Sequence, residues 1–307
     1  MLFLQSMTKI INSTINVHGQ LLSLATPQVM GILNVTPDSF FAGSRKQTEL
    51  EIAQRANQIV AEGGTIIDVG AFSTRPGADE VSMEEEMARL RKALPIIRKE
   101  QPDVALSIDT FRPEVAQMAV EEYGADIIND VSEGGITGIV DTPLMQDNDD
   151  EYPAIFRMMG KLKVPYILMS VQKDVHDMLK GFSKEVQQLR DLGVKDIILD
   201  PGFGFGKTME ENFKLLHEMD KLQVMDLPLL VGVSRKRMIW KTLDITADEA
   251  LNGTTVINTL ALAKGANILR VHDVKAAVEA TRLVREASFA IEPTVTDRRE
   301  VIINIEY

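Results

Sequence analysis

Two spacings of apolar positions alternate along the chain. Short apolar runs recur about every 30–40 residues, and between them apolar residues return at every third or fourth position. The runs predict buried strands at 29–33, 66–69, 104–108, 126–128, 166–169, 197–199, 229–233 and 267–271. The helical spacing predicts helices at roughly 48–62, 83–99, 114–122, 152–161, 183–192, 209–219, 246–263 and 274–287. In the first of these helices the apolar face consists of Ile52, Ala53, Ala56, Ile59 and Val60.

The number of strand–helix units decides the expected fold class. Eight units of the size of a βαβ repeat follow one another, and eight parallel strands close into a TIM (β/α)8 barrel. A doubly wound open sheet is the alternative, and the count favours the barrel. We therefore expect one α/β domain over residues 1–307: an N-terminal β-hairpin in 1–26, the barrel in 27–287 and a short C-terminal extension in 288–307.

Several boundaries carry signals of their own. Pro113 and Ser183 are expected to start helices, because proline suits the first helical turn and a hydroxyl caps it. Residues 133–151 are rich in glycine and then acidic, which favours an exposed, charged loop over a calcium site. Residues 301–307 alternate like a strand, and pairing with the N-terminal hairpin or with another chain both stay open.

Composition narrows the class of protein. With 45% apolar residues among 307, the chain can bury a full core, and the absence of cysteine excludes disulfides, zinc–thiolate sites and thiol nucleophiles. A net charge of −12 argues against nucleic acid or anionic lipid as a general partner. No signal peptide and no apolar run of about 20 residues is present, so we expect a cytoplasmic protein.

One stretch, I-L-D-P-G-F-G-F-G-K at 198–207, combines a strand end with alternating glycines. Such glycines expose backbone N–H groups and let a ligand approach closely. The G-x-G-x-x-G cofactor fingerprint fails because Lys207 is off the spacing and no acidic residue ends a strand about 20 residues later. A P-loop fails because proline stands at its first glycine. The pattern favours a binding loop in which Phe203 and Phe205 offer flat apolar faces, with a tight turn bearing surface phenylalanines as the alternative.

Polar residues gather at the ends of the predicted strands, where a barrel of this kind places its active site. Carboxylates, amides and an ammonium suit a flat heterocycle with hydrogen-bond donors and acceptors, and they are Asn34, Asp109, Asn129, Asp200 and Lys236. A second, cationic set suits an anion and comprises Arg75, Arg270 and His272.

Other roles are open for single members of these sets. We interpret Asp68 and Asp130 as helix caps or loop braces. Asp109 and His272 could each cap the helix that follows, and Lys207 and Arg235 could form structural ion pairs. The remaining histidines have no such context and are interpreted as surface or turn residues: His18, His176 and His217.

The residues at the strand ends resemble the dihydropteroate synthases of folate biosynthesis. The matching segments are M-G-I-L-N-V-T-P-D-S-F (30–40), D-V-G-A-F-S-T-R-P-G-A (68–78), S-I-D-T (107–110), I-N-D-V-S (128–132), D-P-G-F-G-F-G-K (200–207), V-S-R-K (233–236) and R-V-H-D-V (270–274). They follow in order over 29–287. The resemblance implies a TIM barrel, a homodimer, and the joining of 6-hydroxymethyl-7,8-dihydropterin diphosphate to p-aminobenzoate with release of pyrophosphate.

The resemblance also implies roles, position by position. The dihydropterin would be held by Asp109, Asn129, Met169, Asp200, Lys236 and Arg270. The diphosphate would be bound by Asn34, Arg75, Arg270 and His272, with Mg²⁺ near Asn34. The p-aminobenzoate, and sulfonamides that mimic it, would be framed by Phe40, Thr74, Pro76, Phe205 and Lys236. The catalytic set would be Asp109, Asp200, Lys236, Arg75, Arg270 and His272.

Departures from the family pattern occur at three places. Phe41-Ala42-Gly43 stands where the family commonly has an acidic residue, and Ser170 stands where it commonly has histidine. Arg237 replaces a serine that often contacts the p-aminobenzoate carboxylate, and an arginine can pair with that group. None of these changes removes a residue assigned to pterin or diphosphate.

Two other functions compete with the synthase. A methyltetrahydrofolate–corrinoid methyltransferase would share the aspartates and the asparagine but would not need S-T-R-P-G at 73–77 or R-V-H at 270–272. A non-catalytic pterin-binding homologue would not need Lys236, Arg75 and His272. The chemistry favours a dissociative substitution at carbon, because an aromatic amine is a weak nucleophile and the cationic set stabilises the departing pyrophosphate.

Overall fold

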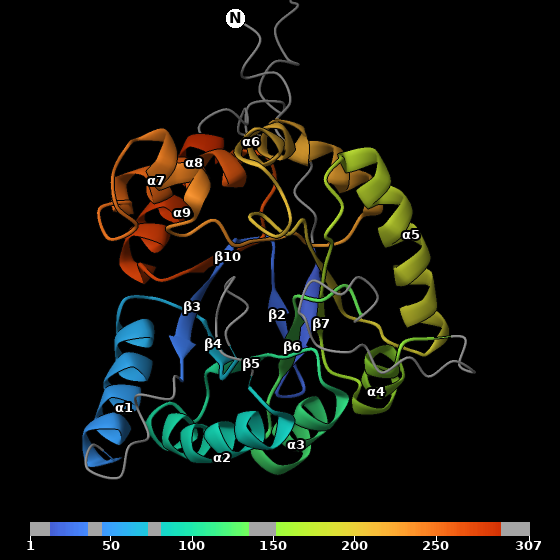
Figure 1. The fold of residues 1–307 in the computed structure, drawn as a ribbon, viewed down its shortest axis with the longest axis vertical. Coiled ribbons are helices and arrows are strands. Elements are labelled where there is room, and N and C mark those ends of the chain that lie inside the picture. Colours follow the sequence, from blue (N-terminus) through green and yellow to red (C-terminus); the bar gives the residue numbers. More distant parts are fainter. Residues whose placement is uncertain (1–12, 36–44, 73–80, 135–151, 290–307) are drawn as a thin grey trace, which may run out of the picture.

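The computed structural model describes residues 13–35, 45–72, 81–134 and 152–289. Eight parallel strands form one sheet in the order β8-β7-β6-β5-β4-β3-β10-β9. A parallel bridge between Leu199 and Leu229 joins its two edges, and the Leu199 N–H donates to the Pro228 carbonyl at 2.8 Å. The sheet is thus a nearly closed barrel, and the helices surround it (Figure 1). The expected TIM barrel is confirmed.

The strands agree with the prediction except at one edge. Their bounds are β3 Gln28–Asn34, β4 Ile66–Gly70, β5 Ala105–Asp109, β6 Ile127–Asp130, β7 Tyr166–Met169, β8 Ile197–Asp200, β9 Leu230–Val231 and β10 Ile268–Val271. β9 has two residues instead of the expected 229–233. Beyond this short ladder, the Ser234 side chain, rather than a backbone carbonyl, accepts the His272 N–H at 3.1 Å.

The helices follow the strands as expected, with three corrections. Their bounds are α1 Arg45–Ala61, α2 Met83–Glu100, α3 Pro113–Tyr123, α4 Ala154–Leu162, α5 Val175–Asp191, α6 Met209–Glu218, the 3₁₀ helix η2 Met219–Met225, α7 Arg237–Thr242, α8 Leu251–Ala263 and α9 Val274–Phe289. Pro113 begins α3 as predicted. The prediction that Ser183 starts a helix is wrong: α5 begins eight positions earlier, capped by Asp174, and the Ser183 hydroxyl donates to the Leu179 carbonyl within it. The predicted 246–263 helix begins at Leu251, and α7 was not predicted.

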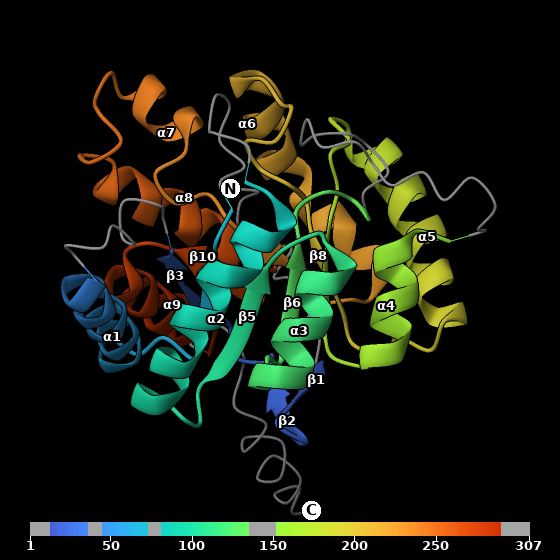
Figure 2. The same cartoon turned by 60° about the horizontal axis from the view of Figure 1, so that its bottom comes forward.

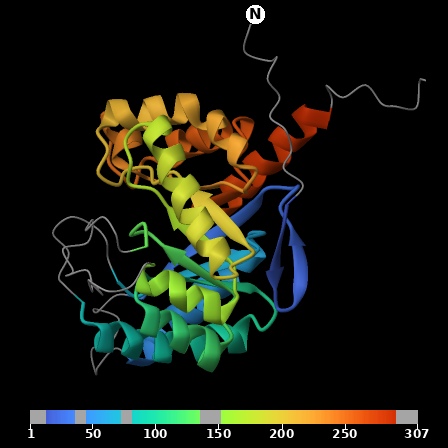
Figure 3. The ribbon, with the colours of Figure 1, turned by 90° about the vertical axis from the view of Figure 1, so that its right-hand side faces the viewer.

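The predicted N-terminal hairpin is present and closes one end of the barrel. β1 (Thr14–Val17) pairs antiparallel with β2 (Gln20–Ser23). The turn between them uses His18 and Gly19, both at positive φ. Figures 2 and 3 show the hairpin beside the amino ends of the strands. There Ile15 and Val17 of the hairpin, together with Leu24 after it, pack against the bottom layer of the barrel interior. The barrel strands supply the rest of this layer: Met30, Ile66, Ala105, Ile127, Ile167, Ile198, Leu230 and Ile268.

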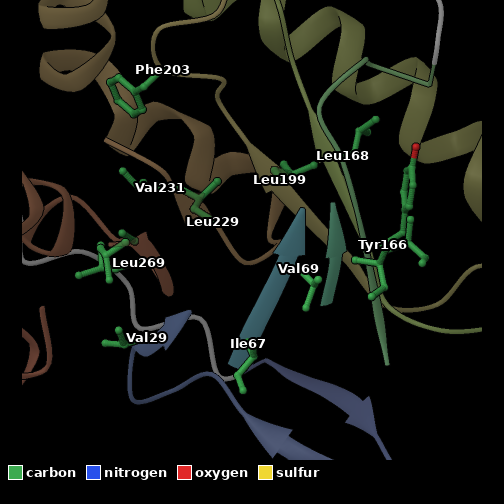
Figure 4. Packing of buried hydrophobic residues seen from close by; sticks show 14 of the residues in the cluster. Val29, Ile67, Val69, Tyr166, Leu168, Leu199, Phe203, Leu229, Val231 and Leu269 are labelled. Atoms are coloured by element: carbon green, nitrogen blue, oxygen red, sulfur yellow. The ribbon is translucent and has the colours of Figure 1, made fainter. Parts of the chain in front are cut away.

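Side chains alternate between two apolar environments along each strand. One set packs outward against the helices, and Figure 4 shows members of it: Val29, Ile67, Val69, Tyr166, Leu168, Leu199, Leu229, Val231 and Leu269. The other set points into the barrel. In β4, for example, Ile67 and Val69 face the helices, so Ile66 and Asp68 face inward. This alternation decides which polar residues reach the site.

Candidate functional site

The inward positions change from apolar to polar toward the carboxyl ends of the strands. Above the bottom layer, each strand from β4 to β8 and β10 supplies an inward residue two positions later. These residues, in chain order, are Asp68, Ser107, Asn129, Met169, Asp200 and Arg270. One layer higher, β3, β4 and β5 end side by side on Asn34, Gly70 and Asp109. The barrel therefore presents a polar cup at the rim predicted from the strand ends.

Arg270 lies at the centre of the described part of this cup. Its Nε donates to Asp68 Oδ2 and its Nη2 to Asp109 Oδ2, each at 2.6 Å. Asp68 is completely buried, whereas Asp109 and Arg270 keep some exposure. The interpretation of Asp68 as a cap or loop brace is wrong, because its strand position turns it into the barrel. Asp109 is not a cap either, since no side chain caps α3.

Asp109 has an unusual affinity for its proton. Burial raises the pKa of this carboxyl, Arg270 acts to lower it and the nearby charge of Asp68 to raise it, and the net pKa is about 7. A carboxyl with a pKa near 7 is present in both its protonated and its ionised form at physiological pH. It is thus suited to a reaction in which charge develops beside it.

Asp200 and Lys236 form the opposite side of the cup. Asp200 accepts the Gly202 N–H at 2.8 Å, and burial raises its pKa while Lys236 acts to lower it. Burial lowers the pKa of Lys236 to about 8, opposed by Asp200. The Lys236 ammonium donates to the Phe203 carbonyl and lies 4.6 Å from the centre of the Phe205 ring. A ligand beside this ammonium thus meets one carboxylate and one aromatic face.

The loop 200–207 is built differently from either sequence interpretation. Phe203 is fully buried in the outer core, so it is neither a ligand platform nor a surface residue, whereas Phe205 is partly exposed. Lys207 forms no ion pair within hydrogen-bond distance among the described residues. Its ammonium donates instead to the carbonyls of Ser170, Gly202 and Phe205 at 2.9–3.4 Å. Lys207 therefore fixes the loop from inside.

His272 closes the rim next to Arg270. Its Nδ1 lies 3.1 Å from the Ser234 hydroxyl, and it caps no helix, so that interpretation is wrong. Burial lowers the pKa of His272 to about 4, assisted by the charge of Arg270, so the imidazole is neutral near pH 7. His272 also borders a hollow of about 590 Å³ that Arg55 and Lys275 help to line. Arg235 forms the expected structural ion pair, with Asp273 at 2.8 Å.

Asn34 and Asp109 flank a space that lacks a side chain. A Cβ added to Gly70, between them, would lie 3.3 Å from Asn34 Oδ1 and 3.7 Å from Asp109 Oδ2. Asn34 is exposed, and its amide oxygen is a hard ligand of the kind that Mg²⁺ takes. No group of three or more histidine or acidic side chains in the described part of the chain has metal-site geometry. A single protein ligand such as the Asn34 oxygen is compatible with Mg²⁺, because this ion usually keeps several water ligands and binds phosphate oxygens of the substrate.

Of the remaining predicted site residues, the structure places two and does not describe four. Met169 is fully buried below Gly202, and a Cβ on Gly202 would come within 3.1 Å of its Cγ. Arg237 is exposed at the first position of α7, beside Lys236. Four predicted residues lie outside the described part of the chain: Phe40, Thr74, Arg75 and Pro76.

Sequence reasoning missed three side chains that organise the site. Ser107 and Asp68 are bonded at 2.6 Å in the barrel interior, and Ser234 contacts His272. The signal for Asp68 was its place between Ile67 and Val69, since alternation puts it on the same face as Ile66. Only the structure shows that this face is the inside. Asp130, by contrast, faces outward and braces its loop as predicted, through Ser132, Gly134 and Tyr166.

Comparison with known proteins agrees with this geometry. The family model described as "Pterin binding enzyme" matches residues 30–272. A dihydropteroate synthase of Escherichia coli K12 is 37% identical over 283 residues, covering 90% of this chain and 96% of the relative. One from Synechocystis is 39% identical over 266 residues, covering 81% and 86%.

Solved structures give the same result. The Xanthomonas albilineans dihydropteroate synthase with 4-aminobenzoic acid has a TM-score of 0.76 and 34% identity, covering 91% of this chain and 99% of that one. The Yersinia pestis enzyme with a pterine–sulfa conjugate has a TM-score of 0.74 and 32% identity, with the same coverage. None of the described helices is both long and apolar enough to cross a membrane.

The barrel, its polar cup and these matches define the class of protein: the chain belongs to the pterin-binding enzymes. More narrowly, its full-length relatives are dihydropteroate synthases, and its function is theirs. It is a transferase of folate biosynthesis that condenses 6-hydroxymethyl-7,8-dihydropterin diphosphate with p-aminobenzoate to give 7,8-dihydropteroate and pyrophosphate.

Proposed function

We propose that the polar cup binds the dihydropterin ring and that the rim beside Arg270 binds its diphosphate. The cup offers acceptors at Asp109, Asn129 and Asp200, and a donor at Lys236, which together match a ring edge that carries both N–H groups and a carbonyl. Met169 lines the apolar floor. The observation that carries this proposal is the convergence of these buried polar groups inside one barrel end.

Arg270 and His272 stand where the leaving group would be. Arg270 bridges two carboxylates and its side chain keeps 21% of its surface exposed, so it can add a phosphate contact without moving far. His272 is neutral in the free protein. A phosphate oxygen beside it favours the imidazolium, which stabilises the charge on departing pyrophosphate. Arg75, whose position the structure does not describe, is proposed to join them on sequence grounds.

A dissociative substitution at carbon fits these groups. The amine of p-aminobenzoate is a weak nucleophile, so the barrier falls most if the C–O bond to the diphosphate breaks ahead of attack. The pterin methylene then becomes electron-poor, and the carboxylates of Asp109 and Asp200 stabilise it electrostatically inside a buried cup. The amine nitrogen then forms the new C–N bond and loses one proton. Pyrophosphate leaves with the electron pair of the broken C–O bond.

Mg²⁺ is proposed to bind at Asn34. The amide oxygen of Asn34 beside the empty side-chain position of Gly70 provides one ligand, and diphosphate oxygens and water would complete the octahedron. When bound, the ion neutralises charge on the diphosphate. Removal by chelation should therefore weaken diphosphate binding more than binding of the free pterin ring.

The p-aminobenzoate is proposed to lie over Phe205, next to Lys236. These two side chains form a flat, cationic corner at the mouth of the cup, and Arg237 is exposed close by for the carboxylate. The sequence adds Phe40, Thr74 and Pro76 to this subsite. Sulfonamides are proposed to compete here, as the ligands bound to the Yersinia pestis relative suggest.

A homodimer is proposed through the exposed apolar surface of α8 and α9. Large apolar side chains are 42–72% exposed at Leu251, Val256, Leu260 and Leu283. Large exposed apolar side chains on neighbouring helices are typical of a subunit interface. A cytoplasmic location stays a prediction.

Activity is tested by pyrophosphate release with Mg²⁺, dihydropterin diphosphate and varied p-aminobenzoate. We expect release that depends on p-aminobenzoate, with dihydropteroate as product. Pterin binding without any turnover would contradict the proposal and favour the non-catalytic homologue. Methyl transfer to a corrinoid without pyrophosphate release would favour the methyltransferase.

A further inference from the structure

The amide of Asn129 has a fixed orientation. Its Nδ2 lies 3.3 and 3.4 Å from the two carboxylate oxygens of Asp68, and both residues are fully buried. A carboxylate only accepts hydrogen bonds, so the amide group that faces it must be the NH₂. Arg270 and Ser107 hold the carboxylate of Asp68 in turn, each at 2.6 Å.

The same contact leaves the amide oxygen free. Asn129 Oδ1 is a buried side-chain oxygen with no hydrogen-bond partner within the described structure. A buried acceptor without a partner has lost its hydration without compensation, so it is an atom that a bound ligand can satisfy. Asn129 faces into the barrel from β6, next to Asp109 of β5. Its unpaired oxygen therefore lies in the wall of the cup, covered from solvent in the free protein.

We propose that Asp68 is a specificity-determining positioning residue, which turns the oxygen of Asn129 toward the ligand and so sets an acceptor in the pterin-binding cup. Asp68 touches no substrate in this scheme. It acts through Asn129 by excluding the flipped amide, in which two acceptors would face each other. The proposal rests on pterin binding in this cup and adds what decides the donor–acceptor pattern there.

A purely structural role predicts something different. Asp130 is the natural comparison, because it is also a fully buried aspartate of a barrel strand, yet it faces outward and bonds Ser132, Gly134 and Tyr166. Loss of either carboxylate should reduce stability. Only loss of the Asp68 carboxylate should change which ring the cup prefers.

The first variant is Asp68→Asn. The oxygen of the new amide is drawn to the Arg270 Nε–H, so its NH₂ takes the place of Asp68 Oδ1. Asn129 then loses one of the two acceptors that fix its amide, and the flipped amide, which presents its NH₂ to the cup, is no longer excluded. Binding is measured by calorimetry with pterin, which has a 2-amino donor, and lumazine, which has a 2-oxo acceptor. We expect pterin to bind at least about tenfold more weakly and its preference over lumazine to fall at least about tenfold.

The second variant restores the pattern by exchange. Adding Asn129→Asp to Asp68→Asn places a carboxylate at 129 that accepts from the amide at 68 and again offers an oxygen to the ligand. We expect the double variant to recover most of the pterin preference. Asn129→Asp alone sets two carboxylates side by side and should not reproduce wild-type binding.

One control separates this effect from damage to the fold. Asp130→Asn should lower the thermal midpoint and leave the pterin-to-lumazine ratio at the wild-type value. A folded Asp68→Asn protein with wild-type preference, or a double variant no better than the single, overturns the inference. Wild-type protein that binds no pterin overturns the proposed binding site instead.

Discussion

At the scale of single residues, Arg270 links the proposed pterin and diphosphate parts of the site. It joins Asp68 and Asp109, which come from two other strands and lie far away in the sequence. Its charge offsets the burial of both carboxylates, and its remaining exposure leaves it open to a phosphate. In the proposed site, one guanidinium would therefore couple the protonation of Asp109 to occupancy of the diphosphate position.

Asp109 should give the reaction a pH dependence near neutrality. Its pKa is about 7, and the carboxylate form stabilises an electron-poor pterin, so kcat/KM should rise with pH through about 7. Arg270→Gln removes a charge that lowers this pKa, so the inflection should move to higher pH. Steady-state pH profiles of pyrophosphate release test this. An unchanged midpoint in Arg270→Gln would assign the inflection to another group.

His272 should take up a proton when pyrophosphate binds. Its pKa is about 4 in the free protein, and a bound anion must raise it. Affinity should therefore increase as pH falls from the bound pKa toward about 4 and stay constant below that. Calorimetry at pH 6 in buffers of different ionisation enthalpy measures the uptake. His272→Gln is the control, because the ionisation of pyrophosphate itself is common to both proteins, and equal uptake by both would contradict the expectation.

At the scale of elements, the loop after β8 is a rigid support for Asp200. Lys207 bonds three carbonyls around it, and Asp200 accepts the N–H of Gly202. Gly202 and Gly206 both have positive φ, but their surroundings differ. A Cβ at Gly202 would lie 2.1 Å from the Ser170 carbonyl oxygen, whereas a Cβ at Gly206 would meet nothing within 4 Å.

Alanine at these two glycines should have unequal effects. Gly206→Ala adds only the cost of a left-handed alanine, about 1–2 kcal/mol of unfolding free energy, and should leave pterin affinity unchanged. Gly202→Ala forces backbone apart beside Asp200 and should weaken pterin binding at least about tenfold. Urea unfolding and calorimetry measure the two quantities. Equal effects on pterin binding would mean that the loop yields without disturbing Asp200.

At the scale of the whole molecule, the N-terminal hairpin closes the barrel at the end away from the site. Ile15 is buried in the bottom layer, whereas Leu21 of the same hairpin is 74% exposed. The polar cup lies one layer of side chains above the layer that the hairpin covers. We therefore expect the hairpin to contribute to the free energy of unfolding and not to the turnover rate at the rim.

Shortening a buried side chain of the hairpin should lower stability without changing turnover. Ile15→Ala leaves a cavity and should reduce the unfolding free energy by about 2–4 kcal/mol, whereas Leu21→Ala should change it by less than about 0.5 kcal/mol. Urea unfolding measures both, and kcat below the unfolding range should match wild type. A large loss of kcat in folded Ile15→Ala would show that the bottom layer shapes the site.

The exposed apolar surface of α8 should hold two subunits together. Val256 is 51% exposed near its middle, so Val256→Glu would place two like charges in a symmetric interface. We expect a shift from dimer to monomer by sedimentation velocity. Leu21→Glu makes the same kind of change on the hairpin and should stay dimeric. A dimeric Val256→Glu protein would place the interface elsewhere.

Much of this architecture follows from local pattern. The number and order of strands and helices could be read from the spacing of apolar residues, because each element must bury its own face. The residues at the strand ends could be read too, since parallel strands all deliver their carboxyl ends to one rim. That reasoning found Asp109, Asn129, Asp200 and Arg270. It placed the start of α5 wrongly because Ser183 resembles a cap but sits inside a longer apolar periodicity.

Tertiary structure decided which way each polar residue faces. Strands buried on both sides are apolar throughout, so alternation separates two faces without saying which is the barrel interior. Asp68 and Asp130 look alike in sequence, yet closure of the sheet turns Asp68 toward Arg270 and Asp130 toward Tyr166. By itself the sequence determined the barrel and the chemistry available at its rim. Contacts between distant strands determined the pairing of those groups, because only closure brings β4, β5, β6 and β10 around one space.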